Sequence, residues 1–166
     1  MKKNILLAVF TLIASFGLVF AQSRSMAVMP FDIIGNAVTQ DEVEAITELY
    51  ISELVETKKV KIVDRANFDK VMKELNFQNS DWSNSEKTAK LGQALNARFI
   101  SFGKIMKLGK NYNISVSVID ITTSEFVAAR NIRGNSLDAI VEDLYKKMAE
   151  PIATKMEKYK LWEDER

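Results

Sequence analysis

The sequence predicts a mixed α/β fold, a three-layer sandwich in the order βαβααβββα. In the first half of the chain, short apolar segments alternate with apolar residues at helical spacing, which is typical of strand–helix units. In the second half, three strand-like runs follow one another through connectors of hairpin length. We therefore expect a mixed sheet that is covered by helices and whose last three strands form an antiparallel meander.

The first strand–helix unit is expected to consist of a strand at 26–31 and a helix that begins at Thr39. Residues 26–31 are apolar and contain Pro30, which cannot donate to a strand ladder, so this strand is short and is followed by a loop over 32–38. Thr39 and Glu42 have the spacing of a capping box, which predicts that a helix begins there. The apolar stripe of this helix is Val43, Ile46, Tyr50 and Leu54.

A second unit is expected from a strand at 60–63 and a helix that begins at Arg65. Asp64 stands at the N-cap position of this helix, where a carboxylate accepts from a free backbone amide. We interpret Asp64 as that cap and Arg65 as a brace to a neighbouring element, although the two could also form a charged pair that contacts a partner. Ser85 is expected to cap a third helix, in which Gly92 makes a close packing contact.

The meander is predicted from runs at 99–106, 112–119 and 125–133. The middle run alternates cleanly, with Ile114, Val116 and Val118 on one face and Asn113, Ser115 and Ser117 on the other. A last helix is expected from residue 136, with a kink or break near Pro151, because proline removes an amide donor and crowds the preceding turn.

The first 21 residues have the layout of a cleavable secretory signal. A short basic start precedes a mostly apolar run at 5–20, and the small Ala21 fits the peptidase pocket before Gln22. That run of 16 residues is short for a spanning helix, which needs about 20, although an uncleaved anchor stays open. We expect cleavage between Ala21 and Gln22, and a single periplasmic domain over 22–166 that reaches the outer membrane only through a partner.

The composition excludes several classes of function. The chain has no cysteine and no histidine, which rules out disulfides, zinc–sulfur sites, thiolate nucleophiles and His-dependent catalysis. Removal of residues 1–21 takes away two lysines and no acid, which leaves 21 basic against 22 acidic residues and a net charge of −1. A near-neutral chain gives no basic footprint for nucleic acid. We expect no catalytic residue, no metal and no cofactor, and no direct insertion of the mature domain into a membrane.

The positions of three aspartates leave an enzymatic alternative open. Asp32, Asp64 and Asp120 each follow a predicted strand, and two converging carboxylates could act as acid and base in a hydrolase. Aspartate is also the ordinary residue of turns and caps, and no motif accompanies these three. A periplasmic hydrolase is therefore the third hypothesis.

Several strings occur in one order along the chain: 27–31 (AVMPF), 62–65 (IVDR), 91–97 (LGQALNA), 99–105 (FISFGKI) and 118–125 (VIDITTSE). In this order the sequence resembles the superfamily of the curli assembly/transport component and the B-type penicillin-binding protein activators. The resemblance implies an α/β sandwich that acts in the periplasm through protein contacts. It assigns Asp64, Arg65, Gly92, Gly103 and Asp120 to structural positions of the family pattern.

Two departures bear on this resemblance. Members of both branches are lipid-anchored through a cysteine that this chain lacks, and the secretion branch inserts long amphipathic hairpins where this chain has tight connectors. We therefore favour regulation of peptidoglycan synthesis over the alternative, an accessory subunit of a curli-type outer-membrane secretion system, and a homo-oligomer is left open. Ser124 also replaces the glycine that is usual in the family's last turn. Trp82 and Trp162, which the periodic core explains least, are the candidate contacts with a cell-envelope protein partner.

Overall fold

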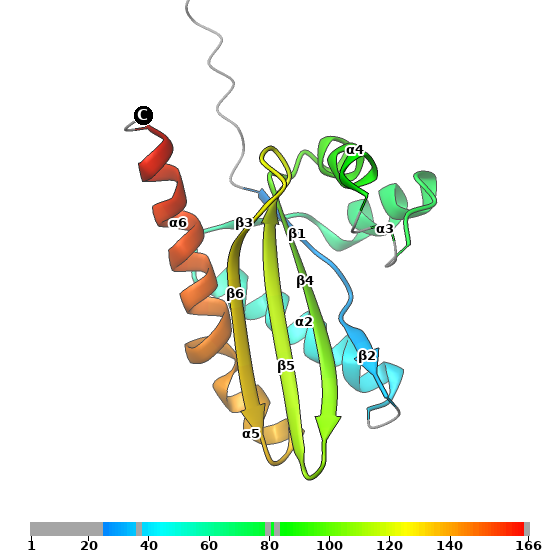
Figure 1. Ribbon diagram of the computed structural model, residues 1–166, viewed down its shortest axis with the longest axis vertical. Helices are drawn as coiled ribbons and strands as arrows, with labels where there is room; N and C mark the ends of the chain where they lie inside the picture. The colour runs from blue at the N-terminus through cyan, green and yellow to red at the C-terminus, as the bar shows by residue number, and fades with distance from the viewer. Residues whose placement is uncertain (1–24, 36–37, 79–80, 82–83, 165–166) are drawn as a thin grey trace, which may run out of the picture.

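A computed structural model describes residues 25–35, 38–78, 81 and 84–164, which form a mixed α/β sandwich (Figure 1). The strands are β1 (Ser25–Val28), β2 (Asp32–Ile34), β3 (Lys61–Ile62), β4 (Phe99–Leu108), β5 (Asn111–Asp120) and β6 (Glu125–Gly134). They form one six-stranded sheet in the order β3-β1-β4-β5-β6, with β2 beside β4. The β1–β3, β1–β4 and β2–β4 pairs are parallel, whereas β4–β5 and β5–β6 are antiparallel. The predicted mixed sheet with its antiparallel meander is confirmed.

Helices pack on both faces of the sheet, but they cover them unequally. Helices α2 (Gln40–Glu56), α5 (Leu137–Asp143) and α6 (Glu150–Asp164) belong to the larger core on one face. Helices α3 (Arg65–Glu74) and α4 (Ser85–Leu95) lie on the other side, near one end of the sheet only (Figure 1). The third layer of the sandwich is therefore partial.

The larger core begins with the predicted stripe of α2. Its members Val43, Ile46, Tyr50 and Leu54 are all buried. Thr39 and Glu42 form the expected capping box, since the Thr39 amide donates to the Glu42 carboxylate at 2.7 Å and the Glu42 amide donates to Thr39 Oγ1 at 3.2 Å. Local capping and apolar spacing thus set this helix on the sheet in the predicted register.

Several segments differ from the sequence prediction. The first strand ends at Val28 rather than at Phe31, and the cap of α4 is Asn84 rather than Ser85. The segment expected to be a loop from Asp32 instead begins with β2, whose residues 32–34 pair with 104–106 of β4. Three residues are too few for a detectable alternation, so the pairing depends on β4, which offers its edge beyond the end of β1. The strand expected at 60–63 is only two residues long, Lys61–Ile62.

The C-terminal helical region changes its hydrogen bonding just before Pro151. Residues Leu144–Ala149 form a π-helix, η2, between α5 and α6. Proline lacks the amide donor of a regular helical turn, and the chain accommodates this with wider turns. The helix continues as α6, so its apolar side stays packed on the sheet through Met148, Ile152 and Met156.

Candidate partner-binding surface

One face of the β4–β6 meander has no helix over most of its length. In Figure 1, α2 and α5 lie behind these strands, while α3 and α4 reach only their upper end. Cross-strand register defines the open face by three rows: Phe102–Ser117–Ala129, Lys104–Ser115–Asn131 and Met106–Asn113–Arg133. The intervening residues Ile105, Ile114 and Ile132 are buried in the core. We call the three rows the open sheet face.

An aromatic pair lies at the border of the open sheet face. Phe102 packs against the smaller core under α3 and α4, and the Phe126 ring meets it edge-on at a centroid distance of 6.0 Å. Phe126 is 69% exposed, the highest value among the large apolar side chains described. A large aromatic ring that is fixed on one side and exposed on the other is the type of anchor that protein interfaces favour.

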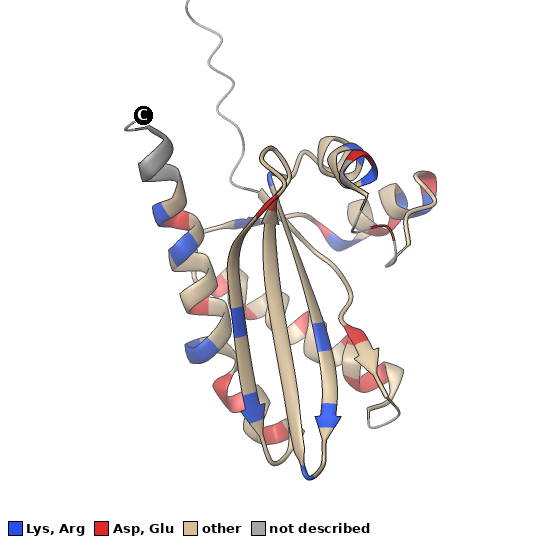
Figure 2. Ribbon diagram, viewed as in Figure 1, with Lys and Arg blue, Asp and Glu red and all other residues tan. Residues whose placement is uncertain are grey.

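The charges of the meander are separated. Its basic side chains are Lys104, Lys107, Lys110, Arg130 and Arg133. The two acidic residues, Asp120 and Glu125, lie at the opposite end, next to the β5–β6 turn (Figure 2). Two of the cations, Lys104 and Arg133, belong to the open sheet face, where both side chains are exposed. These two cations are the charged side chains of the three rows, and Asp32 of the neighbouring strand β2 lies beside Lys104.

Asn113 adds a polar feature to the centre of the lowest row. Its Oδ1 atom is buried and accepts no hydrogen bond from the described part of the chain. Met106 and Arg133 lie on either side of it in the cross-strand register. A buried acceptor without a donor costs free energy, so this position is unfavourable in the isolated chain.

A buried ion pair fixes the end of the sheet where the aromatic pair lies. Arg98 donates from Nε and Nη2 to Oδ2 of Asp120, at 3.1 and 2.9 Å, and their side chains are 9% and 0% exposed. The other carboxylate oxygen of Asp120 accepts from the Thr122 amide at 2.8 Å. The Arg98 guanidinium also lies 5.3 Å from the Phe99 ring centre and 5.7 Å from that of Tyr159. This pair ties the β5–β6 turn and α6 to the start of β4.

The structure places the other family-pattern residues in structural contacts. The Asp64 carboxylate accepts from the Asn67 amide at 3.1 Å as the N-cap of α3. Arg65 lies 3.2 Å from Asp69 and 4.0 Å from Glu48 of α2, which links the two helices.

Two glycines permit close packing. A Cβ atom at Gly92 would meet the Ile121 side chain at 1.9 Å, and one at Gly103 would meet the Phe31 ring at 2.7 Å.

The three carboxylates of the hydrolase hypothesis do not form a reactive pair. Asp120 is paired with Arg98, Asp64 caps α3, and Asp32 lies in β2 beside Lys104. Within the described ranges no group of three or more Asp or Glu side chains could hold a metal ion. These three carboxylates thus occupy an ion pair, a helix cap and a strand, and no two of them converge.

The two tryptophan candidates fall outside this description. Trp82 and the side chain of Trp162 are not among the described residues, and neither is the expected cleavage site at Ala21 and Gln22. Sequence reasoning missed Phe126, Lys104, Arg133 and Arg98. For Phe126, Lys104 and Arg133 the available signal was charge or aromaticity at outward positions of the predicted strands, whereas Arg98 lies just before a predicted strand and is buried. Among the described residues, no helix is long and apolar enough to cross a membrane.

Comparisons with known proteins agree with this architecture. The family model described as peptidoglycan-synthase activator LpoB matches residues 17–129, which is 113 of the 166 residues. No curated protein matches the chain by sequence.

Several solved structures share the fold, among them the following three. The LpoB C-terminal domain from Escherichia coli has 10% identity and a TM-score of 0.55, over 75% of this chain and 93% of that one. Lipoprotein GNA1162 from Neisseria meningitidis has 12% identity and a TM-score of 0.59, over 76% and 96% of the two chains. The hypothetical protein CT253 from Chlamydia trachomatis has 10% identity and a TM-score of 0.56, over 80% and 97%.

Proposed function

The chain belongs to the peptidoglycan-synthase activator LpoB family, and from this premise we propose that it binds a peptidoglycan synthase in the cell envelope and raises its activity. The observation that carries the proposal is the family match, which spans more than two-thirds of the sequence. The protein acts by binding energy alone and works as an exported, periplasmic regulator without a catalytic centre.

We assign the contact with the synthase to the open sheet face. The Phe102–Phe126 pair supplies an exposed aromatic anchor, and Lys104 and Arg133 supply positive charge beside it. The partner surface is accordingly expected to be acidic around an apolar depression. Complementary charge mainly speeds association, whereas the buried aromatic anchor contributes most of the affinity.

The test combines capture with an activity measurement. The protein, expressed from its full sequence, is immobilised and exposed to envelope extract. A purified synthase is then assayed for glycan polymerisation in the presence and in the absence of the protein. Capture and stimulation of a synthase are the expected results. Enrichment of secretion-channel or fibre proteins instead would contradict the proposal and favour the curli-type alternative.

Variants locate the surface. Phe126→Ala is expected to weaken capture by about 2 kcal/mol with little change in melting temperature, because its ring is mostly exposed. The charge reversal Lys104→Glu/Arg133→Glu should slow association, and Lys61→Glu/Lys73→Glu, which changes exposed lysines elsewhere by the same charge, is the matched control.

Two further variants, Trp82→Ala and Trp162→Ala, distinguish a role in docking from a role in folding at those two positions. Loss of capture without loss of stability would add them to the contact surface, whereas an early melt of either variant would place that residue in the core.

A further inference from the structure

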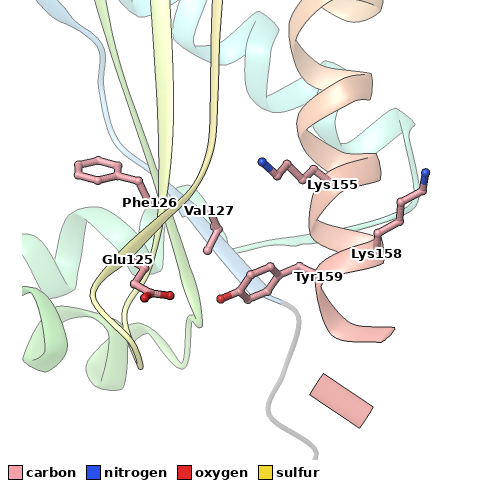
Figure 3. Close-up of a pocket in the computed structure, with 6 residues that line it drawn as sticks. All are labelled: Glu125, Phe126, Val127, Lys155, Lys158 and Tyr159. Carbon is pink, nitrogen blue, oxygen red and sulfur yellow. The ribbon is translucent and has the colours of Figure 1, made fainter. Parts of the chain in front are cut away.

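A pocket opens between β6 and α6 (Figure 3). It has a volume of about 440 Å³ and is lined by Glu125, Phe126, Val127, Lys155, Lys158 and Tyr159. Val127 and Tyr159 face each other across it, while the Phe126 ring points away toward the open sheet face (Figure 3). The pocket thus borders the surface assigned to the synthase at Phe126, whereas its other lining residues do not belong to the open sheet face.

A strand irregularity directs Val127 into this position. The register between β5 and β6 shifts at Val118/Ile119, so that Ile119 pairs with Phe126 and Val118 with Ala128. Val127 is the extra residue, and it is buried on the α6 side together with Ala128. Bulges of this kind re-aim single side chains and interrupt regular pairing.

The opposite wall of the pocket is held in place before any ligand arrives. The Tyr159 ring packs edge-on against Phe99 at 6.1 Å and under the Arg98 guanidinium at 5.7 Å. Arg98 is in turn fixed by its buried pair with Asp120. A preformed apolar wall lowers the entropic cost of binding a ligand.

β6 is also an edge strand over its ten residues, because it stands last in the sheet order of the described chain. An edge strand presents unpaired backbone donors and acceptors to which an extended segment can add. Lys155 extends from α6 toward the strand, whereas Lys158 points to the outer side of the helix (Figure 3). Arg130 is exposed on β6. Neither lysine forms an ion pair with a described carboxylate, and Glu125 is the one acid that lines the pocket.

From this juxtaposition we propose that the edge of β6 and the pocket between β6 and α6 form a second binding site, which takes an extended acidic segment of a partner protein. The segment adds to β6 as a further strand, places a bulky apolar side chain between Val127 and Tyr159, and pairs its carboxylates with Lys155, Lys158 and Arg130. A second copy of this chain does not fit as well, because the β6 strand that it would add carries two basic residues, Arg130 and Arg133, and one acid, Glu125, and so is not an acidic segment.

This site is tested with a synthetic peptide of about ten residues in which glutamate alternates with phenylalanine and valine. Binding to the protein expressed from its full sequence is followed by fluorescence anisotropy, and protection of the β6 amides by hydrogen exchange. We expect saturable binding with added protection over 125–134. Lys155→Glu/Lys158→Glu should weaken binding by about tenfold or more, while Lys61→Glu/Lys73→Glu leaves it unchanged.

Strand addition is tested separately with two peptides that are N-methylated at alternate residues. Only one of the two sets of amides can face β6, so one methylated peptide should lose binding and the other should keep it. Equal binding of both, or no effect of the Lys155/Lys158 reversal, would overturn the proposal. Self-association of the protein with protection of the same amides would also overturn it, in favour of a second copy as the occupant. None of these outcomes depends on capture of a synthase, so the two proposals fail independently.

Discussion

Replacement of Asp120 with asparagine is expected to lower the free energy of unfolding by about 3–5 kcal/mol, although asparagine has nearly the same shape. The carboxylate is fully buried and neutralises Arg98, whose side chain is itself only 9% exposed. Asparagine can still accept from the Thr122 amide, but it leaves the Arg98 guanidinium buried without its counter-charge. The loss therefore comes from an uncompensated charge rather than from a cavity.

Arg98→Met is expected to cost a similar amount, because it leaves the Asp120 carboxylate unpaired, while its thioether keeps part of the packing on Phe99 and Tyr159. The double variant contains neither buried charge. Its loss should therefore be clearly smaller than the sum of the two single losses, since replacement of a whole buried pair is often nearly neutral. The difference is the coupling energy of the pair.

Urea denaturation of the four proteins, followed by circular dichroism, measures this cycle. Each single variant should also melt on the order of 10 °C lower, at about 2–4 °C per kcal/mol for a domain of this size. Glu86→Gln, which breaks the exposed pair with Lys90, is the control and should leave the midpoint unchanged. If Asp120→Asn costs less than about 1 kcal/mol, or if the two single losses simply add, the pair does not fix this end of the sheet.

Three further predictions concern the core and the turns. Gly103→Ala should destabilise the fold by about 1–3 kcal/mol, because the added methyl group meets a Phe31 ring that is already packed on Tyr50. Gly92→Ala should destabilise it less, because the Ile121 side chain can change its rotamer and alanine favours the helix. Burial raises the pKa of Tyr50 above its usual 10.0, so the folded state keeps the phenol proton at pH values where the unfolded state releases it. The free energy of unfolding should therefore fall as the pH rises above about 10. Urea midpoints between about pH 8 and 11 should fall more steeply for the native sequence than for Tyr50→Phe, and parallel curves would refute this. Ser124→Gly should raise the free energy of unfolding by up to about 1 kcal/mol, and the melting temperature with it, because Ser124 has a φ of +59° that glycine adopts without strain. An unchanged or lower melting temperature would contradict this prediction.

Much of the architecture was predictable because its signals are local. The alternation of Ile114, Val116 and Val118 identified a strand with one buried face, and the Thr39–Glu42 spacing located the start of α2. Short connectors between consecutive strands can only join antiparallel neighbours, so the meander followed without knowledge of the rest of the chain. Each of these inferences depends on residues that are close in sequence.

The candidate surfaces were decided by contacts between distant segments. Arg98 and Asp120 are 22 positions apart, and no local sequence pattern around either residue predicts that the two form a pair. The exposure of Phe126 depends on where α3 and α4 end over the sheet, and the pocket at Val127 depends on a bulge that brings it opposite Tyr159 of α6. Periodicity determines which side of a strand is apolar, but only the packing of the helices determines how much of the other side they leave open to a partner.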